Sequence, residues 1–383
     1  MREFLLVAAF AAIVGLGISG SLYQHDPARQ HLMSGLVALA SLGAYVAGFR
    51  VWKNADAASR RRLTASLHGL LMIDVIILVF MGAMTASTRS GMAFTTWPHA
   101  NGLLWPSLDY WWHNREFFFE HGHRLLGQLA GFLAILALVW AWQSRRDEPR
   151  NFRVVAAIFA LICVQGLLGG LTVKAVTPWW TSTLHGLFAQ LVMAGIAWMI
   201  LCATESWMAV RSVDEESGYF RWLSKWTCWV LIIQSGLGAA FRHNTKVAVK
   251  DASGQLMRTP EGHVLYREWL EGNTPLLFAH IGFAVFALTF IMMLGMSLRR
   301  HELPLLRHLS LAMLIGSCLQ VALGVVAVIT VMHREEKRYD TVETILTSAH
   351  LVNGALLFVL AVLISAVLRR QSPRRNFFSP EAS

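Results

Sequence analysis

Residues 116–131, EFFFEHGHRLLGQLAG, place two glutamates, two histidines and an arginine at the start of a long apolar run. Ionisable side chains at the edge of a bilayer are costly and usually serve a function. Of the 383 residues, 55% are hydrophobic and only 15% are charged, whereas about a quarter of the residues of a soluble protein are charged. Apolar segments that could cross a hydrocarbon core of about 30 Å recur along the chain. The sequence therefore predicts an all-α, polytopic membrane protein.

The apolar segments predict about ten membrane-spanning helices. They cover residues 4–22, 31–50, 66–88, 116–142, 153–173, 181–204, 222–241, 276–298, 304–332 and 343–368. Lys and Arg concentrate in one alternate set of connections, which the positive-inside rule places in the cytoplasm. Both termini are therefore expected on the cytoplasmic side of the cell (inner) membrane. The net charge of +10 lies in these short loops, so no nucleic-acid partner is expected. The first span is longer than the core of a signal peptide, and we expect it to be retained.

A histidine recurs near the outer end of four predicted spans. The four residues are His123, His185, His280 and His350. The separation is 62 residues within the first pair and 70 within the second, and the alternating topology places all four at about the same depth. We interpret this repeat as an internal duplication. It predicts two pseudo-symmetric four-helix bundles, at 63–208 and 217–370, preceded by an extra transmembrane hairpin at 1–62.

Paired histidines at one depth favour haem binding, because two facing imidazoles can bind the iron of a flat macrocycle on both faces. A single buried histidine is more often a packing residue, but four in a repeat are hard to explain by packing. No Cys or Asp stands beside them at zinc-ligand spacing. Three of the four spans follow a span with a glutamine and then glycines, at Gln165, Gln234 and Gln320. Those glycines could clear space for a porphyrin or simply allow close helix packing.

A glutamate one turn before the histidine occurs only at the first histidine. Glu116, Glu120 and His123 recur at i, i+4 and i+7 and so lie along one helical stripe. Glu120 is one turn outward from His123 and is a candidate for proton exchange at the edge of a bound macrocycle. The alternative is a structural ion pair between Glu120 and Arg124. The second half offers no such glutamate, which predicts one half that holds a cofactor and another that carries out chemistry.

These motifs resemble the haem A synthase family. The resemblance covers roughly residues 66–370 and rests on ExxHR (Glu120, His123, Arg124), QGLLGGLTV…LH ending at His185, GAAFRH through Arg242 and His243, and the spans of His280 and His350. It implies an eight-helix core of two bundles. The carboxy-terminal half would hold a resident haem b between His280 and His350, and the amino-terminal half would receive haem O between His123 and His185.

The reaction implied by the resemblance oxidises a ring methyl of haem O to a formyl group, by successive hydroxylations, to give haem A. Glu120 would be essential to this chemistry, and Glu116, Arg124 and Arg242 are candidates for propionate-binding or accessory roles. Expected partners are a haem O synthase, an electron donor and a second copy of the chain. A diheme b-type electron carrier or a haem transporter would use the same four histidines, and Glu120 separates these alternatives from an enzyme.

Overall fold

The computed structural model describes residues 49–94, 97, 114–176, 178–210, 218–255, 257, 265–268, 273–332 and 341–371, together with residues 43 and 46. The predicted hairpin at 1–62 lies mostly outside these residues, and with it the first predicted span and nearly all of the second. Each of the other eight predicted spans overlaps one long helix of the described part.

The described residues form eight long helices. These are α3 (Ala57–Ser87), α5 (Arg115–Gln143), α6 (Pro149–Lys174), α7 (Trp179–Cys202), α9 (Gly218–Asn244), α10 (Thr274–Leu298), α11 (Pro304–Met332) and α12 (Thr341–Gln371). Seven of them are long and apolar enough to cross a membrane. The exception is α9, which carries tryptophans, a glutamine and several basic residues within its length. The prediction of a helical membrane protein is thus confirmed in its coarse form.

Short elements fill some of the connections. A 3-10 turn η1 (Ser90–Met92) follows α3, and helix α8 (Glu205–Met208) follows α7. The strands β1 (Lys246–Ala248) and β2 (Tyr266–Glu268) pair antiparallel, with Val247 opposite Arg267. The sequence analysis missed this hairpin, because polar residues dominate the segment after α9 and hide any alternation of apolar residues.

Local sequence explains where two of the helices begin. The Asp56 side chain accepts a hydrogen bond from Ser59 N at 2.8 Å and caps α3. The Asn114 side chain accepts from the main-chain N–H groups of Glu116 and Phe117, at 3.1 and 3.2 Å, and caps α5. Such caps satisfy N–H groups that have no partner in the first turn of a helix. The cap on α5 fixes the start of the helix that carries Glu120 and His123.

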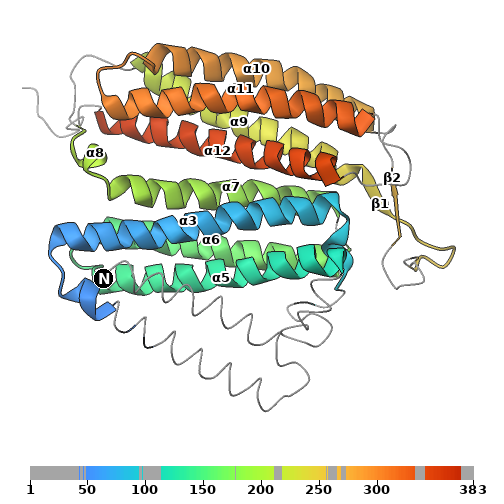
Figure 1. Cartoon of the computed structure of the whole chain (residues 1–383), viewed down its shortest axis with the longest axis horizontal. Coiled ribbons are helices and arrows are strands. Elements are labelled where there is room, and N and C mark those ends of the chain that lie inside the picture. Colours follow the sequence, from blue (N-terminus) through green and yellow to red (C-terminus); the bar gives the residue numbers. More distant parts are fainter. Residues whose placement is uncertain are drawn as a thin grey trace, which may run out of the picture.

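The long helices pack into two closed sets of contacts. In the first set, α3 contacts α5, α5 contacts α6, α6 contacts α7, and α7 returns to α3. In the second, α9 contacts α10, α10 contacts α11, α11 contacts α12, and α12 returns to α9. In Figure 1, the second set lies above the first. They meet where α7 and α3 contact α12 and where α7 contacts α9, and Ser235 donates to Gln190 across that contact at 3.2 Å.

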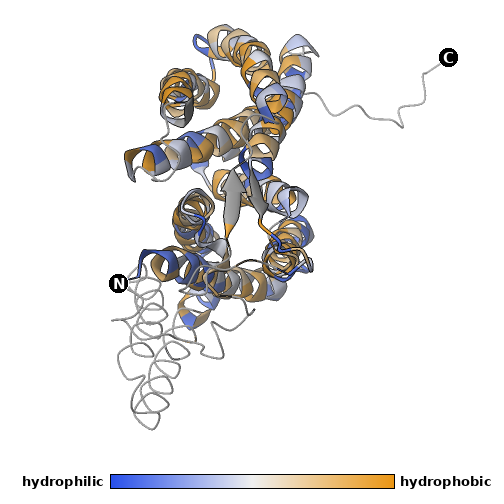
Figure 2. Ribbon diagram, turned by 90° about the vertical axis from the view of Figure 1, so that its right-hand side faces the viewer, coloured by the Kyte–Doolittle hydropathy of each residue, from blue (hydrophilic) through white to orange (hydrophobic). Residues whose placement is uncertain are grey.

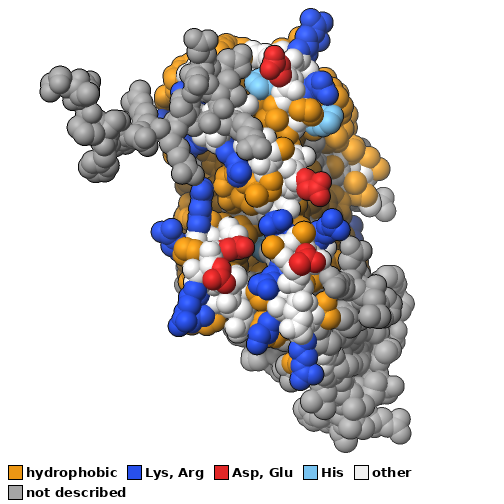
Figure 3. All heavy atoms as spheres, turned by 90° about the vertical axis from the view of Figure 1, so that its left-hand side faces the viewer, with side chains coloured by type: hydrophobic (Ala, Val, Ile, Leu, Met, Phe, Trp, Pro, Cys, Tyr) orange, Lys and Arg blue, Asp and Glu red, His pale blue; other side chains and the backbone are white. Residues whose placement is uncertain are grey.

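The outward faces of the helices are apolar. Leu167, Phe278 and Val285 are each about two-thirds exposed. The view along the helices in Figure 2 shows hydrophobic residues over most of the helical surface. Lys and Arg instead gather at the end of the molecule where α3 begins and α12 ends, seen in Figure 3. An apolar outer surface with basic residues gathered at one end is typical of a membrane-spanning bundle.

Helix contacts in the second set depend on the absence of side chains at specific glycines. A Cβ added to Gly295 of α10 would lie 2.7 Å from Leu314 Cδ2 of α11, whereas one added to Gly282 would meet nothing within 4 Å. We therefore predict that Gly295→Ala lowers the free energy of unfolding by about 1–3 kcal/mol, because an overpacked contact must shift. The matched control, Gly282→Ala, should cause no loss. Thermal unfolding of the purified protein in detergent compares the two, and equal loss from both would contradict the prediction.

Candidate functional site

The four predicted histidines occupy equivalent places in the two helix sets. His123 lies eight residues after the start of α5 and His185 six residues after the start of α7. His280 lies six residues after the start of α10 and His350 nine residues after the start of α12. The helices α5 and α7 lie across the first set from each other, as α10 and α12 do in the second. Each set thus brings two histidines towards its centre from opposite sides.

The histidines form two pairs with nearly the same geometry. The ring centres of His123 and His185 lie 6.3 Å apart, with an interplanar angle of 78°. Those of His280 and His350 lie 6.4 Å apart, with an angle of 79°. Two imidazoles that bind one metal from opposite sides, through metal–nitrogen bonds of about 2 Å, have ring centres about 6 Å apart. The spacing of both pairs fits a metal bound between them.

The donor set also fits haem iron better than a protein-only metal site. The described residues contain no group of three or more His, Cys, Asp or Glu that could hold a metal. Two ligands alone leave the remaining positions of an iron to the nitrogens of a porphyrin. The buried Nδ1 atoms of His185 and His350 also make no hydrogen bond within the described part of the chain. Each pair can therefore serve as the axial ligands of a haem.

A glycine of the preceding helix lies against each histidine. Cβ atoms added to Gly82, Gly238 and Gly324 would lie 2.7, 2.7 and 3.0 Å from Cε1 of His123, His280 and His350, respectively, and one added to Gly169 would lie 3.5 Å from Cε1 of His185. The sequence alone favours neither of two roles for the glycines after each glutamine. The contacts at Gly82, Gly238 and Gly324 show that a glycine makes room for an imidazole, whereas a methyl group on Gly169 would still fit beside His185.

The residue one turn before each glycine contacts the same histidine. His123 Nδ1 lies 3.0 Å from the main-chain oxygen of Leu78. The three equivalent positions are the glutamines singled out in the sequence. Gln165 donates to His185 O at 2.8 Å, Gln234 Nε2 lies 3.1 Å from His280 Nδ1, and Gln320 Nε2 lies 3.2 Å from His350 Nε2. The contacts at His123, His280 and His350 reach a ring nitrogen and so restrict the orientation of the imidazole, whereas Gln165 contacts the main chain of His185.

Glu120 is 3% exposed and is held on both carboxylate oxygens. Phe94 N donates to Oε2 at 2.8 Å, and Arg124 donates to Oε1 in an ion pair. Arg124 also donates to Phe94 O at 3.2 Å. The ion pair that the sequence allows is therefore present within α5, and the two bonds to the Phe94 main chain tie α5 to the segment after α3. Phe94 had no signal in the sequence, because it lies in an irregular segment without a periodic pattern.

A second residue of that segment also lies near a histidine pair. A Cβ added to Gly170 of α6 would lie 2.8 Å from the ring of Trp97. Gly170 is adjacent to Gly169, which contacts His185. Phe94 thus contacts α5 at Glu120, and Trp97 contacts α6 at Gly170.

Arg242 links the two helix sets. It lies in the last turn of α9 and donates to Ala83 O at 2.6 Å and to Ser87 Oγ at 2.5 Å, both on α3. Ala83 directly follows Gly82, against which His123 packs. Glu116, the remaining predicted site residue, lies in the first turn of α5. The structure therefore brings Arg124 to Glu120, whereas Arg242 bridges the sets.

Two other ionisable residues are buried in α3. His68 and Asp74 are each 2% exposed. His68 Nδ1 contacts Thr64 O at 2.8 Å, while the Asp74 carboxylate makes no hydrogen bond within the described residues. Neither shares a hydrogen bond with the four histidines among those residues, so they stand apart from the paired site.

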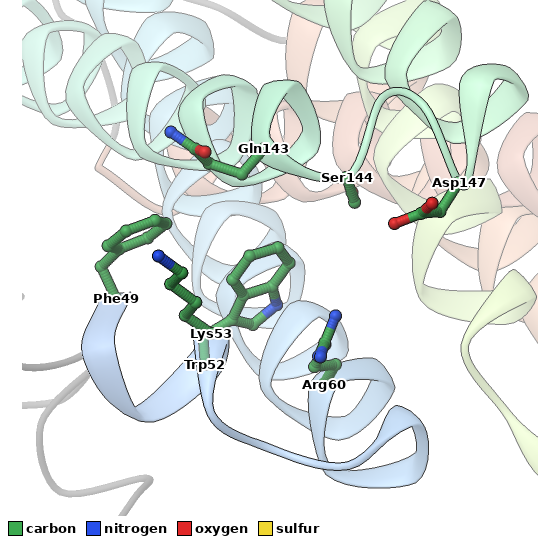
Figure 4. Close-up of a pocket in the computed structure, with 7 residues that line it drawn as sticks. All are labelled: Phe49, Trp52, Lys53, Arg60, Gln143, Ser144 and Asp147. Carbon is green, nitrogen blue, oxygen red and sulfur yellow. The ribbon is translucent and has the colours of Figure 1, made fainter.

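The cavity in Figure 4 lies at the far end of α5 from His123. Its volume is about 250 Å³. Its walls are Phe49, Trp52, Lys53, Arg60, Gln143, Ser144 and Asp147. Arg60 lies 5.7 Å from the centre of the Trp52 ring, which is a cation–π contact between the start of α3 and the residues before it. Because Gln143 is the last residue of α5, this cavity belongs to the basic end of the molecule and not to the histidine pairs.

The chain is similar in sequence to proteins of a known family. Residues 112–362 match the model of the COX15-CtaA family, described as cytochrome oxidase assembly protein. A protein named heme A synthase from Erythrobacter litoralis is 26% identical over 328 residues, which are 74% of this chain and 91% of that protein. Proteins of the same name from Methylobacterium radiotolerans and Beijerinckia indica are 30% and 28% identical over 173 and 134 residues.

The last two matches cover only part of each protein. They span 43% and 33% of this chain, and 46% and 37% of the respective relatives. The family match, in contrast, runs from just before α5 into α12 and includes all four histidines. The fold and paired histidines define a helical membrane protein with two potential haem sites. The chain belongs to the COX15-CtaA family of cytochrome oxidase assembly proteins.

The Glu120–Arg124 pair should contribute measurably to stability. We predict that Glu120→Ala lowers the free energy of unfolding by about 3–5 kcal/mol, because it leaves the half-buried Arg124 guanidinium without its counter-charge. The double variant Glu120→Ala/Arg124→Ala should lose less than the sum of the two single losses, by about 0.5–3 kcal/mol. Thermal unfolding in detergent of the wild type, the two single variants and the double variant gives the coupling free energy. The exposed Glu302→Ala serves as a control. Strict additivity would show that the pair is not coupled.

Proposed function

We propose that this chain is a haem A synthase, which oxidises a ring methyl of haem O to a formyl group and yields haem A. The observation that carries the proposal is a carboxylate, Glu120, beside only one of two equally spaced imidazole pairs. An electron carrier would need both pairs and no such carboxylate. Membership of the COX15-CtaA family and the similarity to proteins named heme A synthase support the proposal.

We assign the two helix sets different roles. Residues 63–208 form the half that receives haem O between His123 and His185, and residues 217–370 form the half that holds haem b between His280 and His350. The two closed sets of helix contacts support a pseudo-symmetric pair of four-helix bundles. Residues 1–62 add a transmembrane hairpin, which brings the total to about ten spans.

The chain spans the cell (inner) membrane with both termini in the cytoplasm and with the histidines towards the outer side. Lys and Arg at the end where α3 begins and α12 ends support this orientation (Figure 3), because basic residues flank membrane spans on the cytoplasmic side. All four histidines lie six to nine residues after the start of helices that begin at the opposite end.

The protein residues around His123 have separate tasks. When bound, haem iron supplies the redox chemistry of the methyl oxidation. His123 and His185 hold the substrate on its two faces, so that its edge lies at a fixed depth. Glu120, one turn outward on α5, accepts and passes on protons that the oxidation releases. Arg124 keeps the Glu120 carboxylate in place, and Phe94 and Trp97 exclude water from that end of the helix set.

The resident haem and the expected partners follow from the same assignment. His280 and His350 would hold haem b, which would supply redox chemistry next to the substrate half. Oxidation of a methyl to a formyl group removes four electrons, so an external oxidant or redox partner must contact the protein, and a haem O synthase supplies the substrate. Arg242 and Glu116 lie near enough to the outer end to assist binding of haem propionates or access to the site. We also propose that the protein self-associates in the membrane.

Pigment extraction tests the catalytic proposal. In cells that also make haem O, the wild-type chain should produce haem A, whereas Glu120→Ala and Glu120→Gln should not. Glu120→Gln can still accept the hydrogen bond from Phe94 N but cannot take up a proton, so it separates chemistry from folding. Haem A is measured by chromatography of extracted haems, with Glu302→Ala as the control. Unchanged haem O in cells with the wild-type chain would refute the synthase assignment.

Spectroscopy tests the assignment of the haem b half. Protein purified from cells that make no haem O should show a low-spin b-type spectrum. His280→Ala and His350→Ala should lose most of this spectrum, because each removes one axial ligand. His123→Ala and His185→Ala should retain it. Equal loss from all four variants would contradict the division of roles between the two halves.

A further inference from the structure

The four histidines are not packed equally tightly. For His123, His280 and His350, a methyl group on the facing glycine would lie 2.7–3.0 Å from the ring, closer than ordinary van der Waals contact, so the ring or the helix would have to shift. For His185, the same group on Gly169 would lie at 3.5 Å, an ordinary van der Waals distance. Space for about one methyl group therefore remains beside His185, but not beside the other three rings.

The hydrogen bonds also hold the His185 ring less tightly than the rings of the other histidines. His123 Nδ1 contacts the Leu78 main-chain oxygen, which belongs to a rigid helix. Gln234 reaches a ring nitrogen of His280 as well as its main-chain oxygen, which lies at 3.1 Å. Gln165 donates instead to the main-chain oxygen of His185. This bond holds the position of α7 but leaves the imidazole free to rotate about its side-chain bonds.

The contact at His350 is reinforced further. Gln320 Oε1 accepts a hydrogen bond from Asn353 Nδ2 at 2.7 Å, and the same Asn353 nitrogen donates to Gly316 O at 2.9 Å. These bonds fix the orientation of the Gln320 amide, whose nitrogen faces the His350 ring. Both histidines of the second set therefore have an amide held against the ring.

We infer that His185 is the releasable ligand of the substrate haem, and that His123 remains its firm ligand. This inference rests on the proposed function, because it concerns the haem O site. A substrate haem must enter and leave in every turnover, whereas a resident haem does not. Breaking one iron–histidine bond before the other is easier when one imidazole has room to turn. The opened face of the haem then lies on the side of α6 and α7, next to Trp97.

Carbon monoxide binding tests the inference without measuring catalysis. CO binds ferrous haem only where an axial position is free or its ligand can dissociate. The full-length protein is purified with haem b alone, and then loaded with haem O and reduced. The preparation with haem b alone should bind little CO. Loading with haem O should create a CO-binding population equal in amount to the haem O bound.

A glycine variant and a matched control identify the ligand that dissociates. Gly169→Ala should slow CO binding to the haem O population several-fold, because the added methyl contacts the His185 ring and restrains it. Gly166→Ala lies three residues earlier on α6, where a Cβ meets nothing within 4 Å, and should leave the rate unchanged. Equal CO-binding rates in wild type and Gly169→Ala would overturn the inference.

Histidine variants provide a second readout. His185→Gly should retain haem O and bind CO at once, and added imidazole should slow that binding by restoring a ligand. His123→Gly should lose haem O. Equal loss of haem O from both variants would refute the distinction between the two ligands. A wild-type protein that holds haem b but binds no haem O would instead refute the proposed function, so the two failures can be told apart.

Discussion

The contact between an imidazole and the bare backbone of a neighbouring helix is the constraint on which the site depends. In three helix pairs, a glycine removes the side chain that would otherwise crowd the histidine ring, and in the fourth pair Gly169 lies against His185 with more room. The residue one turn earlier contacts the same histidine through a main-chain or amide group. Helices in lipid approach closely where residues are small. A glycine at such a position therefore brings two helices together and also positions the histidine ring.

The two helix sets share this geometry but differ in the chemistry of the residues around their histidines. The ring spacings agree to within 0.1 Å, 6.3 against 6.4 Å, so the pairs are equivalent in shape. Among the described residues, the first set has the buried Glu120 carboxylate one turn before His123, and a segment after α3 whose main chain donates to it. The second set has a buried glutamate, Glu343, but two turns before His350. The second set has instead glutamine amides against both rings. The first arrangement suits reaction and exchange, and the second suits retention.

Much of this arrangement could be predicted from the sequence, because hydropathy and a repeated histidine are periodic signals. The eight spans from 66–88 onward and the pairing of the histidines were predicted from spacing, and the Glu120–Arg124 ion pair was an alternative that the spacing allowed. The roles of Gly82 and Leu78 were not predicted, since that pair lacks the glutamine that marks the other three. Phe94 and Trp97 lie in an irregular segment, where residues that contact distant helices leave no periodic pattern. The β1–β2 hairpin was missed because polar residues dominate its segment.

Arg242 has a consequence for the architecture as a whole. Its guanidinium reaches from α9 to the backbone and Ser87 hydroxyl of α3, at the same end of the molecule as the histidines. Ser87 in turn lies 3.4 Å from Thr347 Oγ1 of α12. These polar bonds add to the packing of α7 against α9 and of α3 and α7 against α12, which holds the two imidazole pairs at one separation. Electron tunnelling depends steeply on distance, so in the proposed function such bonds would help to keep the distance between two bound haems constant.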